Sequence, residues 1–212
     1  MLHSTYIKIM NLFSEHNGGM SNGYLYSSVL KDNNVTSAQI NELIRLSSVR
    51  KISHGLYQWI DPANDKPENY KFIEICLVNN DAVICGESAL FYHGLIDTEP
   101  ENVSVATKRS DRSALSLPFA INRHFITDNS FEEDIENVPT PYGSFRIYKP
   151  ERSIVDMIRF SALPDELTQT SSLADYYKSM DSEAVLRLTV YADKMKYGTK
   201  VRQYLDSLSD QE

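Results

Sequence analysis

The chain has 212 residues, of which 42% are hydrophobic, and a formal net charge of −8. Its apolar runs are much shorter than the roughly 18 residues that a membrane-spanning helix needs, and residues 1–10 lack the basic-then-apolar order of a signal peptide. The length suits one ordinary domain and one smaller domain, each with its own core. We therefore expect a soluble, cytoplasmic protein with no membrane partner.

The cysteines and histidines show no metal-binding pattern. Cys76 and Cys85 are single residues on apolar stretches without CxxC spacing, so we expect buried, reduced thiols. The five histidines have no ligand spacing, and the chain contains neither GxxxxGK[ST] nor GxGxxG. We expect no metal and no cofactor.

The acidic charge is unevenly distributed along the chain. Residues 1–60 hold five Lys/Arg against three Asp/Glu, a net +2, whereas residues 61–103 hold two against nine, a net −7. Exposed charges more than about 10 Å apart are largely screened at ordinary salt. The N-terminal segment can therefore face phosphate although the whole chain is acidic.

Three short helices are predicted at the N-terminus. The first spans residues 4–16 and ends at Asn17-Gly18-Gly19, and the second runs through residues 24–30 with Ser21 or Asn22 as its N-cap. The third follows Thr36-Ser37-Ala38-Gln39, which has the T-x-x-Q form of a capping box, and carries an apolar stripe through residues 40–46.

Two β-rich runs follow directly at residues 49–60, around a Ser53-His54-Gly55 turn. Three helices and a hairpin are the order of a winged helix-turn-helix, which we assign to residues 1–65 as a DNA-binding domain. Polar side chains on the third helix would reach base edges, and basic side chains on the hairpin would hold phosphates. The candidate DNA-binding residues are Ser37, Gln39, Asn41, Arg45, Arg50, Lys51 and His54.

The remaining residues, 66–212, predict a larger mixed α/β domain with C-terminal helices, so the whole chain is expected to be α+β. Residues 61–69 are polar, contain two prolines and indicate a linker. Helices are expected near residues 70–78, 87–95, 151–160 and 181–208, the last interrupted near Tyr197-Gly198. Strands are expected at 103–106, 119–125 and 145–148, with residues 139–143 as a turn.

Basic residues on or beside these strands form a possible second basic surface that would continue a DNA track, although carboxylates lie between them. Its members are Lys108, Arg109, Arg112, Arg123, Arg146 and Lys149.

Enzyme motifs are absent from the sequence. No Asp or Glu is followed two positions later by Lys, as a restriction-type nuclease requires, and Gly143-Ser144 lacks the paired aspartates of a nucleotidyltransferase.

Ser88 and His93 are five residues apart on an expected helix and so lie on different faces. Arg152 and Asp156, at i and i+4 on another helix, are expected to pair for a structural purpose. We expect no catalytic residues and no enzyme activity.

Several strings occur in an order that is typical of one family. Gly55-Leu56-Tyr57 is followed by Ser88-Ala89-Leu90, His93-Gly94-Leu95, Val103-Ser104-Val105-Ala106 and then residues 150–156, PERSIVD. Over residues 5–160 the chain resembles AbiEi-type antitoxins of bacterial abortive-infection (type IV toxin-antitoxin) systems, which act in phage defence.

The resemblance implies a transcriptional repressor that binds inverted repeats in the promoter of its own operon, hence negative autoregulation on double-stranded DNA. It further implies an antitoxin domain that counteracts a co-encoded nucleotidyltransferase-like toxin without a stable complex. Two alternatives use the same winged helix: a protein–protein adaptor, and a regulator whose second domain senses a small molecule.

Overall fold

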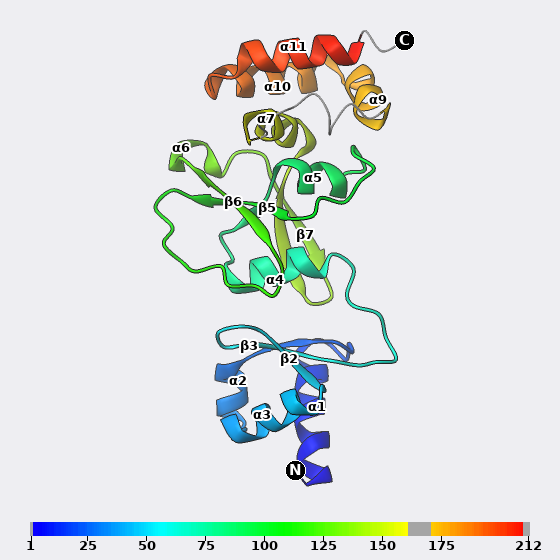
Figure 1. Cartoon of the computed structure of the whole chain (residues 1–212), viewed down its shortest axis with the longest axis vertical. Helices are drawn as coiled ribbons and strands as arrows, with labels where there is room; N and C mark the ends of the chain where they lie inside the picture. The colour runs from blue at the N-terminus through cyan, green and yellow to red at the C-terminus, as the bar shows by residue number, and fades with distance from the viewer. Residues whose placement is uncertain (1, 161–170, 210–212) are drawn as a thin grey trace. The chain divides into compact units, whose positions relative to one another are not determined.

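The computed structural model describes residues 2–160 and 171–209, which form a mixed α+β fold (Figure 1). Its helices are α1 (His3–His16), α2 (Ser27–Asp32), α3 (Ser37–Arg45), α4 (Tyr70–Val78), α5 (Gly86–Tyr92), α6 (Asp128–Phe131), α7 (Pro150–Phe160), α9 (Ser171–Ser179), α10 (Ser182–Lys194) and α11 (Gly198–Ser209). Its strands are β1 (Tyr24–Tyr26), β2 (Val49–Ser53), β3 (Leu56–Trp59), β4 (Val83–Ile84), β5 (Val103–Lys108), β6 (Ile121–Ile126), β7 (Ile135–Thr140) and β8 (Gly143–Tyr148).

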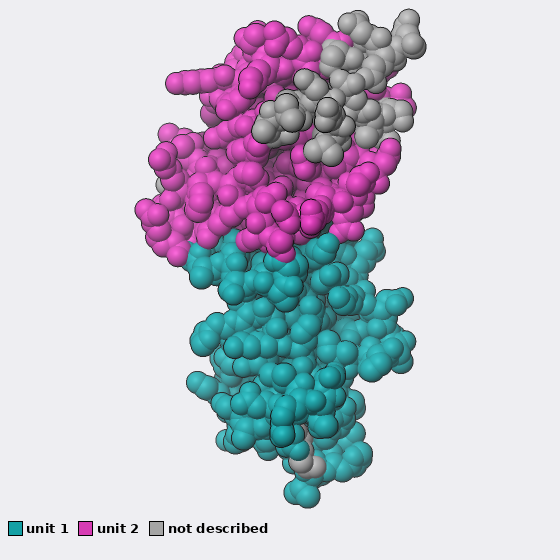
Figure 2. Space-filling model, viewed as in Figure 1, with its two compact units in different colours: residues 1–80, 113–119, 138–145 teal, residues 81–112, 120–137, 146–212 magenta. Residues whose placement is uncertain are grey.

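The chain divides into two compact units, coloured separately in Figure 2. Unit 1 comprises residues 1–80, 113–119 and 138–145, and unit 2 comprises residues 81–112, 120–137 and 146–212. This division differs from the boundary after residue 65 that the linker composition predicts, because α4 and two later segments belong to unit 1. Whether residues 1–65 form a separate DNA-binding domain stays a prediction.

Unit 1 packs three short helices against a three-stranded antiparallel sheet of order β1-β3-β2. The first and third helices and the hairpin lie where the sequence predicts them, and Gly18 and Gly19 follow α1 with positive φ values of 63° and 87°. The core includes Trp59 and the apolar sides of all three helices. Its buried members are Ile9, Phe13, Leu25, Leu30, Val35, Ile40, Leu43, Val49 and Trp59.

The second predicted helix is partly wrong. Tyr24 and Leu25 lie in β1, where they pair with Gln58 and Tyr57 of β3, and the helix begins only at Ser27. A hydrogen-bonded partner strand more than 30 residues away overrides the weak helical spacing of this segment. The turn before β1 is tight, because a Cβ on Gly23 would lie 2.5 Å from the Asn17 amide nitrogen.

Unit 2 is built on the five-stranded mixed sheet of order β6-β5-β4-β8-β7, to whose last two strands unit 1 also contributes residues. Strand β4 runs antiparallel to β5 and parallel to β8, and β5 runs parallel to β6. Helix α7 is buried on most of its surface and packs against α5, α10 and α11.

The predicted strands and helices of this part are present, with four differences. β4 and α6 were not expected, and Pro139 and Thr140, predicted as part of a turn, lie inside β7. Helix α9 was also not expected. Both cysteines are buried and free, as predicted. Within the described ranges, no helix has the length and hydropathy needed to cross a membrane.

Candidate nucleic-acid interface

Helix α3 presents one polar, exposed face in unit 1. Ser37, Asn41 and Arg45 follow one another at intervals of four residues and are all exposed, whereas Ile40 and Leu43 are buried in the core. Since residues four apart lie on the same side of a helix, these three side chains form a single row. The row, which we call the α3 row, is available to an external partner.

Gln39, also predicted to contact bases, is engaged at the start of the helix. The Thr36 side chain accepts a hydrogen bond from the Gln39 backbone, and the Gln39 side-chain oxygen accepts one from the Thr36 backbone N–H at 2.8 Å. This reciprocal capping box, predicted from the sequence, satisfies two backbone donors of the helix end. A bidentate contact of Gln39 with adenine would require it to leave the cap.

The hairpin of β2 and β3 exposes two basic side chains at its tip. Lys51 and His54 are exposed, and among the described residues neither side chain forms an ion pair or hydrogen bond. Gly55 turns the chain with a φ of 77°, and its carbonyl accepts a hydrogen bond from the Ser27 backbone at 2.8 Å. The tip is thereby fixed to the start of α2.

Arg50, the third basic residue predicted on the hairpin, points into unit 1. Its guanidinium donates to the Gln58 side-chain oxygen at 2.6 and 3.2 Å and forms an ion pair with Glu74 of α4. The Arg50 side chain is 26% exposed and that of Glu74 is 0% exposed. These contacts give Arg50 a structural role, so we leave it out of the surface offered to DNA.

Glu74 is the centre of a buried polar network that the sequence did not predict. Tyr24 donates to its Oε1 at 3.1 Å, and Gln58 donates from its amide to the Asn22 carbonyl at 3.0 Å. Among the described residues, Glu74 Oε2 has no hydrogen-bond partner. Burial raises the pKa of Glu74 above its usual value, although Arg50 and Tyr24 oppose this shift. One signal was available, because Glu74 is a lone carboxylate within the apolar run YKFIEICLV.

Half of the predicted second basic surface is paired within unit 2. Lys108 and Arg146 both form ion pairs with Glu132. The pKa of Glu132 is lowered, and the hydrogen bond from Lys108 is the largest cause of this shift. Arg123 forms an ion pair with Asp111 at 2.8 Å. The remaining members, Arg109, Arg112 and Lys149, are exposed, and the first two line an open depression beside Phe125.

The PERSIVD string begins α7 and lies in the interior. Arg152 and Asp156 pair as expected, with Nε 3.0 Å from Oδ2, but both side chains are 0% exposed. Arg152 also donates to the Ser130 carbonyl at 3.0 Å, and its guanidinium stacks over the rings of Tyr148 and Tyr191. The most specific string of the family resemblance is therefore a core-building element.

Ser88 and His93 have different hydrogen-bond partners in unit 2. The Ser88 hydroxyl accepts a hydrogen bond from the Ser104 backbone at 2.9 Å, and a His93 ring nitrogen lies 3.0 Å from the Tyr148 carbonyl oxygen. Each side chain thus has its own backbone partner.

Comparison with known proteins supports the fold. No family model matches the chain. No curated protein matches it either. Among solved structures, the chain is similar to the crystal structure of the Rv2827c protein from Mycobacterium tuberculosis, with a TM-score of 0.52 and 14% sequence identity over 92% of this chain and 81% of that one. At this identity the likeness concerns the fold alone.

Proposed function

We propose that α1, β1, α2, α3, β2 and β3 form a winged helix-turn-helix that binds double-stranded DNA. The observation that carries this proposal is the α3 row, because it places an amide, a hydroxyl and a guanidinium on the outer face of the helix that precedes the hairpin. In helix-turn-helix proteins this helix enters the major groove, and neighbouring elements hold the phosphates.

The chemistry of the exposed side chains suits base contacts by α3 and phosphate contacts by the hairpin. The Asn41 amide can pair with the two hydrogen-bonding positions of adenine, and Arg45 can reach guanine or a phosphate. Lys51 and His54 at the hairpin tip are suited to phosphate oxygens. Ser37, near the first turn, adds a hydroxyl that both donates and accepts.

We further propose that the chain is an autoregulating repressor and the antitoxin of a toxin-antitoxin pair. This part is supported by the resemblance to AbiEi-type antitoxins that the strings in residues 55–57, 88–95 and 150–156 carry. Unit 2 would then counteract the co-encoded nucleotidyltransferase-like toxin. Since the strings in unit 2 are engaged in its interior, the surface around them, and not the strings themselves, would meet any partner.

A reporter gene placed behind the protein's own upstream region tests the repressor. The wild-type chain should lower reporter expression, and an Arg45→Ala/Lys51→Ala variant should restore it. A Lys178→Ala variant, which removes an exposed cation from α9 in unit 2, is the matched control and should repress like the wild type. Unchanged repression by the double variant would contradict the assignment to α3 and the hairpin.

Co-expression with the adjacent toxin gene tests the antitoxin part separately. Because the Arg45→Ala/Lys51→Ala changes lie in unit 1, this variant should still rescue growth. Failure of the wild-type chain to rescue growth would contradict the antitoxin role while leaving the repressor intact.

A further inference from the structure

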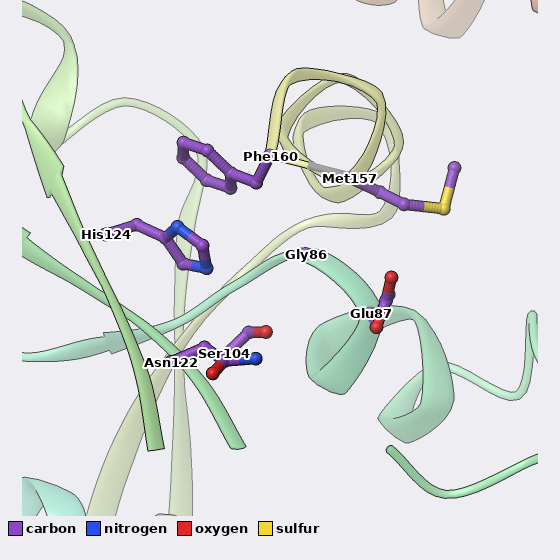
Figure 3. A pocket seen from close by; sticks show the side chains of 7 residues that line it. All are labelled: Gly86, Glu87, Ser104, Asn122, His124, Met157 and Phe160. Atoms are coloured by element: carbon purple, nitrogen blue, oxygen red, sulfur yellow. The ribbon is translucent and has the colours of Figure 1, made fainter. Parts of the chain in front are cut away.

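A cavity in unit 2 gathers polar side chains from three elements and apolar side chains from a fourth (Figure 3). Ser104 of β5 and Asn122 of β6 are register partners, and His124 lies two residues further along β6, so all three face the same side of the sheet. Glu87 of α5 and Phe160 of α7 line the cavity from the helices that cover this side. The cavity is small, about 60 Å³, and is partly open to solvent.

Several of these polar groups have no partner in the described part of the chain. Ser104 is only 6% exposed, lines the cavity, and its hydroxyl makes no hydrogen bond there. The nitrogens of His124 and the carboxylate of Glu87 also lack hydrogen-bond and ion-pair partners among the described residues. Of these groups only Ser104 is buried, whereas Glu87 and His124 are partly exposed. Buried polar groups in folded proteins are nearly always satisfied, so the Ser104 hydroxyl, which faces the cavity, is suited to a polar partner that enters it.

His124 is held in place by an aromatic neighbour. Its ring stacks on Phe160 with centroids 3.9 Å apart and an interplanar angle of 11°. Burial and the nearby charge of Arg159 lower the pKa of His124, which favours the neutral ring, and a neutral imidazole offers one nitrogen as an acceptor. Arg159 itself is held by Asp156 and Met195.

The mouth of the cavity is acidic. A second, open depression of about 400 Å³ lies beside the cavity, shares Glu87 and Asn122 with it and is also lined by Glu99 and Glu101. Among the residues that the structure describes, neither lining includes a lysine or an arginine. The negative potential of this entrance repels phosphates and carboxylates and attracts cations.

We propose that this cleft binds a small aliphatic di- or polyamine. One ammonium group would donate to the Ser104 hydroxyl and to His124 beside the Glu87 carboxylate, and a second would lie near Glu101 in the adjoining depression. An ammonium group has three donors and no acceptor, which matches acceptors at both ends of the cleft. The proposal does not rest on DNA binding by unit 1.

Isothermal titration of the full chain with putrescine and with spermidine, in 150 mM NaCl, tests it. We expect one site per chain, at least tenfold weaker binding in Glu87→Gln, and weaker binding in Ser104→Ala. Glu136→Gln removes an exposed carboxylate from β7, outside the cleft, and is the matched control that should bind like the wild type.

Two results would overturn the proposal. One is the absence of binding heat with both amines. The other is equal weakening in Glu87→Gln and Glu136→Gln, because it would show attraction to the general acidic surface. Binding by Ser104→Ala at wild-type strength would likewise exclude the inner end of the cleft as the ammonium site.

Discussion

The guanidinium of Arg50 forms an ion pair with the carboxylate of Glu74, a side chain with no exposed surface. The pair joins β2 of the hairpin to α4, and Gln58 and Tyr24 each form a hydrogen bond with one of its members. A basic residue on a predicted wing is thus part of the interior of unit 1. This relationship separates the residues that hold the domain together from those free to meet DNA.

Arg50→Ala should destabilise unit 1 by about 2–3 kcal/mol, because it leaves a buried carboxylate without its counter-ion. Urea unfolding followed by fluorescence measures this directly, since Trp59 is the only tryptophan and lies in the core of unit 1. Adding Glu74→Gln to Arg50→Ala should recover at least about 1 kcal/mol, as expected for residues in contact. Lys51→Ala, the exposed neighbour, should stay within about 0.5 kcal/mol of the wild type. Equal losses for Arg50 and Lys51 would contradict the internal role of Arg50.

Glu74 should also give unit 1 a characteristic pH dependence. Its pKa in the folded chain is raised above the usual carboxyl value of 4.5, so the folded state holds this proton more tightly than the unfolded state. By linkage, the contribution of Glu74 to stability is most favourable below pH 4.5 and falls as the pH rises through its raised pKa. The unfolding free energy of the wild type relative to Glu74→Gln should therefore decrease from pH 4 to pH 7. Parallel pH profiles of the two proteins would refute the raised pKa.

In α3 we expect different residues to determine the stability of unit 1 and the recognition of DNA. Thr36→Ala removes one half of the capping box and should lower the stability of unit 1 by about 1 kcal/mol. Asn41→Ala should leave stability within about 0.5 kcal/mol, yet reduce discrimination between the operator and a base-substituted duplex by about 1–3 kcal/mol. Unfolding and binding measured on the same two variants provide the check. A loss of discrimination without a loss of stability in Thr36→Ala would reverse the two roles.

In unit 2, the buried pair of Arg152 and Asp156 predicts a large effect. Asp156→Ala should destabilise unit 2 by about 3–5 kcal/mol, because Arg152 would keep its charge without a carboxylate. Far-UV circular dichroism during urea unfolding monitors this loss. Arg202→Ala breaks an exposed pair with Asp193 and should change stability by less than about 1 kcal/mol. Similar losses of unfolding free energy for the two substitutions would contradict a larger contribution from the buried Arg152–Asp156 pair than from the exposed pair.

Local chemistry explains what the sequence predicted well. The capping box before α3, the Gly18-Gly19 stop after α1 and the Gly55 turn of the hairpin each depend on a few adjacent residues, so their patterns could be identified without a fold.

Long-range pairing explains what the sequence missed. Strand β1 needs β3, and β4 has only two residues, so neither carries enough local pattern to be found. The Arg50–Glu74 pair joins residues 24 positions apart, and a basic residue beside a wing turn was therefore interpreted as a phosphate contact. The cavity at Ser104 depends on the register of β5 with β6, which no single segment encodes.

The most direct test of the account is a fluorescence anisotropy titration of a labelled duplex from the protein's own upstream region against a shuffled duplex at two salt concentrations. We expect the upstream duplex to bind at least about 10³-fold more tightly, with affinity that falls as salt rises. Arg45→Ala/Lys51→Ala should abolish the preference, and Lys178→Ala should retain it. Equal affinity for both duplexes, or no binding even at low salt, would contradict a sequence-specific DNA-binding role for unit 1.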